Sequence, residues 1–136
     1  MAAYLFIVGL QAIGLLVLRV VFGGLMFAHG YPKVGKRRAR VMDAMRSRGI
    51  PGPVTLITGY FEIVGGLLLV FGIGVQVVGL LLALKSAATI YVSRNLFGRG
   101  FDHGYEVEIA WVVVGLALFM LGAGTISVDN YLIPHL

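Results

Sequence analysis

The chain has no cysteine among its 136 residues. This absence excludes disulfides, thiolate nucleophiles, cysteine-ligated zinc and iron–sulfur clusters. Charged residues are also scarce, because Asp, Glu, Lys and Arg make up 12% of the chain against about 25% in ordinary soluble proteins. Hydrophobic residues account for 59% and the mean hydropathy is +0.95. The single core of a 136-residue chain cannot bury all of this apolar surface, and a large part of the surface is therefore expected to face lipid.

The chain also lacks the short motifs that carry known chemistry. It has no phosphate-binding Walker loop, no Gly-x-Ser-x-Gly elbow and no His-Glu-x-x-His zinc motif. The catalytic residues therefore stay unknown at this level. His29 and His103 fall near one end of the apolar runs, but no spacing favours a haem or a metal, and no tightly bound metal or haem is expected.

Long apolar runs predict transmembrane helices. The run over 54–84 would be about 46 Å long as one helix, which exceeds the ~30 Å hydrocarbon core of a bilayer. Gly72 and Gly74 are suited to a tight turn that divides it. The prediction is an all-α, antiparallel four-helix bundle in the membrane, a single domain over 1–136, with spans at about 5–30, 54–71, 75–93 and 108–127.

Lys and Arg are concentrated in the connections between these spans. The connection 31–53 holds seven of them against one acid, Asp43, and the connection 94–107 holds two more. The predicted outer tails and the 72–74 turn hold none. The positive-inside rule then places both connections in the cytoplasm and both termini outside. Residues 36–48 either form an amphipathic helix on anionic lipid or serve only as a topology signal. Nucleic-acid binding is not expected of a basic segment held at a membrane.

Three ionisable residues fall inside the predicted spans at overlapping depths, namely Arg19, Glu62 and Lys85. A charge at the bilayer centre costs at least ~2.5–3.5 kcal/mol, so we expect these three to converge. Arg19 is predicted to pair with Glu62 across the first two spans, with Lys85 near or joining them. Such a cluster either sets helix register alone or also binds a ligand. Lys85 could instead extend to the interface.

Several segments resemble the DoxX family of small membrane proteins. The first is the stretch from Arg19 to Gly30, followed by Lys33. The second is Glu62 with the glycines after it, and the third is the closing run from Gly122 to Asp129. The chain departs from the family pattern at Ala123 and Thr125, where Pro and Arg are common, and at Val92-Ser93-Arg94, where many members carry a histidine.

The resemblance implies a four-helix protein of a prokaryotic inner membrane. Members of the family are linked to quinone-connected sulfur oxidation and to membrane oxidoreductase complexes. We therefore expect a membrane subunit of a redox assembly, surrounded by lipid and by other subunits, with a quinone headgroup or a small anion as candidate ligand. The alternatives are a non-catalytic scaffold or assembly factor and a small-molecule carrier. The candidate binding residues are Arg19, Glu62, Lys85, His29 and Lys33.

Overall fold

The computed structural model describes residues 1–96, 98 and 100–132, and within these ranges it is helical without strands. Phe97 and Arg99 of the predicted second connection, and the C-terminal residues 133–136, lie outside the described residues. The helices are α1 (Ala2–Val34), α2 (Arg38–Arg46), α3 (Gly52–Phe71), α4 (Val75–Asn95), the short π-helix η1 (Phe101–Tyr105), α5 (Glu106–Leu121) and α6 (Val128–Leu132).

Three of these helices, α1, α3 and α4, are long and apolar enough to cross a membrane, judged by length and composition. The helix in the predicted last span is shorter than expected. α5 has 16 residues, about 24 Å at ~1.5 Å per residue, and ends at Leu121 rather than near 127. Gly122 and Gly124 both have positive φ angles, 74° and 81°, which glycine adopts without steric cost and which turn the chain away from the helix axis.

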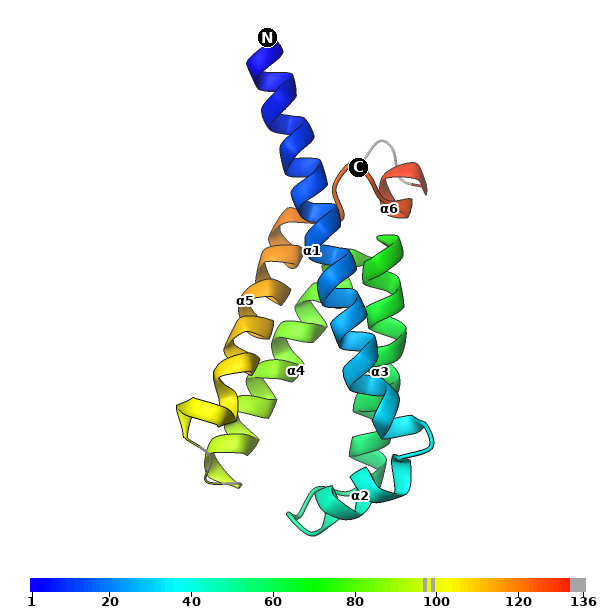
Figure 1. Ribbon diagram of the computed structural model, residues 1–136, viewed down its shortest axis with the longest axis vertical. Coiled ribbons are helices and arrows are strands. Elements are labelled where there is room, and N and C mark those ends of the chain that lie inside the picture. Colours follow the sequence, from blue (N-terminus) through cyan, green and yellow to red (C-terminus); the bar gives the residue numbers. More distant parts are fainter. Residues whose placement is uncertain (97, 99, 133–136) are drawn as a thin grey trace.

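The long helices associate in two pairs, α1 with α3 and α4 with α5 (Figure 1). Glycines make the close approach possible. A Cβ atom added at Gly23 would lie 2.6 Å from the carbonyl oxygen of Gly66, and one at Gly30 would lie 2.6 Å from that of Gly59. Small residues at a helix interface let backbones approach in lipid, where no hydrophobic effect drives association. The α4–α5 pair uses the same device at Gly79 and Gly115.

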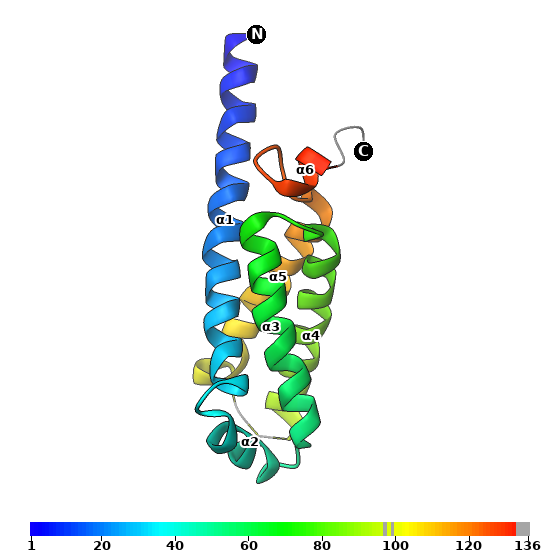
Figure 2. The ribbon, with the colours of Figure 1, turned by 90° about the vertical axis from the view of Figure 1, so that its right-hand side faces the viewer.

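The two ends of the molecule differ in charge and shape. The basic helix α2 lies at one end, whereas α6 and the N-terminal half of α1 lie at the other (Figures 1 and 2). The first turns of α1 extend beyond the other helices, and their apolar side chains are exposed, among them Tyr4, Phe6 and Leu10. The buried core lies lower, where the helix pairs meet. It comprises Met26, Leu69, Val75, Val78, Leu82, Trp111 and Leu118.

Candidate functional site

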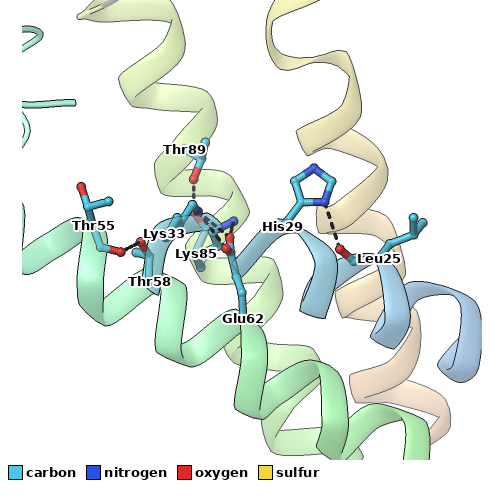
Figure 3. A network of polar contacts seen from close by, with 8 residues as sticks. All are labelled: Leu25, His29, Lys33, Thr55, Thr58, Glu62, Lys85 and Thr89. Atoms are coloured by element: carbon cyan, nitrogen blue, oxygen red, sulfur yellow. Dashed lines mark hydrogen bonds and ion pairs between the residues drawn. The ribbon is translucent and has the colours of Figure 1, made fainter. Parts of the chain in front are cut away.

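Glu62 is the centre of a buried ion-pair cluster. It lies on α3 and is 2% exposed. The Nζ atom of Lys33, near the end of α1, lies 2.9 Å from Oε1 and 2.8 Å from Oε2. The Nζ atom of Lys85, on α4, lies 2.6 Å from Oε1 (Figure 3). The cluster Lys33–Glu62–Lys85 therefore joins the α1–α3 pair to α4, and its formal charge is +1.

Local packing explains how Lys33 reaches Glu62. A Cβ atom at Gly59 would lie 2.7 Å from the Cβ atom of Lys33, so only a glycine leaves room for the lysine stem against α3. Glu62 lies three residues further along α3, on the same face of the helix as Gly59. The lysine side chains are each 21% exposed, so their stems lie along apolar surface while their ammonium groups meet the carboxylate.

The predicted Arg19–Glu62 pair is wrong. Arg19 is 1% exposed, but its guanidinium donates to the backbone carbonyl oxygens of Leu69, at 3.5 Å, and of Ile126. The error came from treating the three depths as equal. The glycine contacts between α1 and α3 place Gly23 opposite Gly66, so Arg19 lies one turn beyond, level with the end of α3, and far from Glu62.

Arg19 belongs to a second polar cluster, at the α3–α4 turn. Asp129 in α6 accepts hydrogen bonds from the backbone N–H groups of Gly74, at 2.8 Å, and Val75, at 3.2 Å. Its carboxylate thereby caps the start of α4, where unpaired N–H groups favour negative charge. The backbone N–H of Asp129 also donates to the Gly72 carbonyl oxygen at 2.9 Å. This cluster attaches the C-terminal segment to the turn, and its contacts point to a structural role.

A cavity of about 750 Å³ adjoins the Glu62 cluster. It lies between the two helix pairs, which diverge toward α2 (Figure 1), and the segment that follows α2 closes part of it through Gly49, Ile50 and Pro51. Its walls are mostly apolar. The polar or titratable side chains that line it are Lys33, Glu62, Lys85, His29, Thr55, Thr58, Thr89, Ser93 and Glu108.

Two of these side chains have a buried polar atom without a hydrogen-bond partner among the described residues. They are Oγ1 of Thr55, on α3, and Oε2 of Glu108, on α5. Thr55 is 3% exposed. Buried polar groups are hydrogen-bonded in the great majority of native structures, and an unpaired one costs about 1–3 kcal/mol. A polar ligand in the cavity would therefore form hydrogen bonds with these unpaired atoms, which lie on two of its walls.

His29 lies at the side of this cavity. Its Nδ1 atom is 3.0 Å from the carbonyl oxygen of Leu25 (Figure 3). Because a carbonyl oxygen only accepts, Nδ1 carries the proton, and in the neutral ring Nε2 is an acceptor. The ring meets Trp111 of α5 edge to face, with centroids 5.9 Å apart. Trp111 in turn contacts Phe22 at 5.2 Å, so α5 and α1 are in contact beside the cavity.

Four of the five candidate binding residues thus gather around one cavity, and Arg19 does not. Thr55 and Glu108 also line this cavity, although neither is among the candidate binding residues named from the sequence. The signal that could have found Glu108 is its spacing, three residues before Trp111 and hence on the same face of one helix. Within the described ranges, no group of three His, Asp or Glu side chains could hold a metal ion.

Comparison with known proteins identifies the family. The DoxX family model matches residues 14–95, more than half of the chain and all of the Lys33–Glu62–Lys85 cluster. The chain belongs to the DoxX family. Together with its long apolar helices, this makes it a multi-pass membrane protein. This DoxX protein is also 26% identical over 119 residues to a Bacillus subtilis (strain 168) protein named "Putative oxidoreductase CatD", covering 88% of this chain and 87% of that one. No solved structure matches.

Proposed function

We propose that this DoxX protein is the membrane subunit of an oxidoreductase assembly and that its cavity binds the headgroup of a lipid-soluble quinone. The observation that carries the proposal is the cavity itself, with the Lys33–Glu62–Lys85 cluster in its wall. A volume of about 750 Å³ is within the ~300–1,000 Å³ range of small-molecule sites, which combine apolar walls with few convergent polar groups.

The lining residues fit such a headgroup. Met26, Leu82 and Trp111 offer apolar and aromatic surface for a ring. Each lysine ammonium has three N–H donors, and Glu62 does not use all of them, so donors remain for a ring oxygen. The unpaired Thr55 hydroxyl supplies another. An isoprenoid tail could pass between the diverging helix pairs into lipid.

The redox role draws support from the relative named an oxidoreductase. The chain has no cysteine, so electrons cannot pass through a thiol of its own. A partner subunit or a bound cofactor would therefore exchange them with the ligand, and this protein would contribute the membrane site at which the quinone binds.

The proposed topology has four antiparallel spans, α1, α3, α4 and α5, in the inner membrane of a prokaryote. α2 carries basic residues at one end of the molecule, and the positive-inside rule places that end in the cytoplasm. Both termini are then external. The cavity, which adjoins α2, would open at the level of the cytoplasmic leaflet.

A scaffold role is the second candidate, and one observation favours it. The N-terminal turns of α1 extend beyond the other helices with exposed apolar side chains. These turns lie beyond the ends of the neighbouring helices, so another membrane subunit could cover them in place of lipid. A scaffold would need this surface and not the cavity.

The test is to purify the full chain from native membranes in mild detergent and to quantify the extracted quinone. Wild type is expected to retain quinone, and Lys85→Met to lose most of it, because a ring oxygen loses a charged donor. The control is Lys36→Met, which removes an exposed lysine that does not line the cavity. Gel filtration checks that each variant is folded. Equal quinone in both variants, or none in wild type, would favour the scaffold.

A further inference from the structure

The cavity has two chemically different walls. On one, the ammonium groups of Lys33 and Lys85 meet at Glu62 and can only donate hydrogen bonds. On the other, α5 contributes Glu108, whose Oε2 atom is buried without a partner among the described residues. As a carboxylate, Glu108 can only accept. The cavity is therefore divided into a donor wall and an acceptor wall.

His29 strengthens the acceptor wall. In the neutral ring Nδ1–H donates to the Leu25 carbonyl oxygen, and Nε2 is then an acceptor. His29 meets Trp111, and Glu108 lies one helical turn before Trp111 on the same face of α5. Both residues line the cavity. Two acceptors therefore lie beside Trp111, and no described side chain donates to Oε2 of Glu108.

The two redox forms of a quinone differ in the hydrogen bonds that they can form. The oxidised form has two carbonyl oxygens and can only accept, so it fits the lysines and leaves Glu108 unpaired. The reduced form has two hydroxyl groups, each of which donates and accepts. One hydroxyl can accept from a lysine while the other donates to the carboxylate. A site built to pair with a hydroxyl rejects the analogue without it, because its own buried group then loses its partner.

We infer that the cavity selects the reduced, dihydroxy form of its ligand and that Glu108 is the residue that makes the selection. This inference rests on the proposed function and specifies its ligand. Glu108 acts by contact, accepting a hydrogen bond from a ring hydroxyl. Lys33 and Lys85 position the opposite oxygen. The protein would therefore hold the quinol in preference to the quinone.

Trp111 supplies a convenient readout, because it is the sole tryptophan of the chain and it lines the cavity. Purified full-length protein in detergent is titrated without oxygen, with decylubiquinol and decylubiquinone, and in parallel with the reduced and oxidised forms of menadione. Fluorescence of Trp111 gives a dissociation constant for each. A hydrogen bond to a charged group corresponds to roughly a ten- to hundredfold difference in affinity. Wild type is expected to bind the reduced form tighter by about that factor.

Glu108→Gln is the decisive variant, because its amide keeps the shape of the side chain and adds N–H donors. It is expected to lose the preference for the reduced form, since the amide can donate to a quinone oxygen. Glu106→Gln is the matched control, because Glu106 is exposed on the same helix and does not line the cavity. That variant is expected to keep the wild-type ratio.

The outcomes separate the two proposals. If wild type binds both redox forms equally, or if Glu108→Gln keeps the wild-type ratio, the selection by Glu108 is refuted while the quinone site stands. If neither form of either probe binds wild type, the proposed function fails as well. The wild-type ratio needs no variant, so the inference stays testable even if Glu108→Gln does not fold.

Discussion

Replacing Glu62 with glutamine is expected to destabilise the protein strongly. The substitution keeps the size of the side chain but leaves the ammonium groups of Lys33 and Lys85 facing one another without an acid between them. Glu62 is 2% exposed and lies within 3 Å of both ammonium nitrogens. Removing one partner of a buried ion pair costs about 3–5 kcal/mol. Because each lysine side chain keeps 21% of its surface exposed, we expect the lower end, about 3 kcal/mol.

The assay is reversible unfolding in mixed micelles, in which a denaturing detergent is titrated into the folded protein. The same measurement is made on the triple variant Lys33→Met, Glu62→Gln, Lys85→Met, which removes all three charges. Apolar replacement of a whole buried ion cluster is often neutral or stabilising, so the triple variant is expected to be more stable than Glu62→Gln alone. If Glu62→Gln lies within about 0.5 kcal/mol of wild type, as surface substitutions do, the cluster does not hold the helix pairs together.

Three further expectations concern packing, the second polar cluster and topology. Gly23→Ala is expected to cost about 1–3 kcal/mol in the same unfolding assay, because its Cβ would overlap the neighbouring helix. Gly24→Ala is the control, since a Cβ there would meet nothing within 4 Å, and it is expected to be neutral or slightly stabilising. Equal losses of stability in the two variants would contradict the glycine contact. Asp129→Ala is expected to cost about 1–2 kcal/mol through the lost cap of α4, and an unchanged midpoint would show that the C-terminal segment does not support the turn. A reporter inserted after Arg40 is expected to read cytoplasmic, and an external reading would reverse the proposed topology.

The sequence by itself determined the class of protein and much of its layout. Apolar runs of helical length and few charges predict membrane helices. The hydrocarbon core offers no water to backbone N–H and C=O groups, and a helix pairs these groups within itself. The structure has α3 ending at Phe71 and α4 beginning at Val75, on either side of Gly72 and Gly74. Glu62 and Lys85 stood out within apolar runs because an intramembrane charge must find a partner. These inferences depend on local composition and need no knowledge of neighbours.

Only the tertiary structure decided which charges meet. Counting residues placed Arg19, Glu62 and Lys85 at similar depths. The register of α1 against α3, however, depends on which glycines touch, and it sets the partner of every charge. That register pairs Glu62 with Lys33 and takes Arg19 to backbone carbonyl oxygens near the α3–α4 turn. A carbonyl oxygen carries no signature in the sequence, since every residue has one. The cavity and the unpaired oxygen of Glu108 likewise arise from how far the two helix pairs diverge, which is a property of packing between segments distant in the chain.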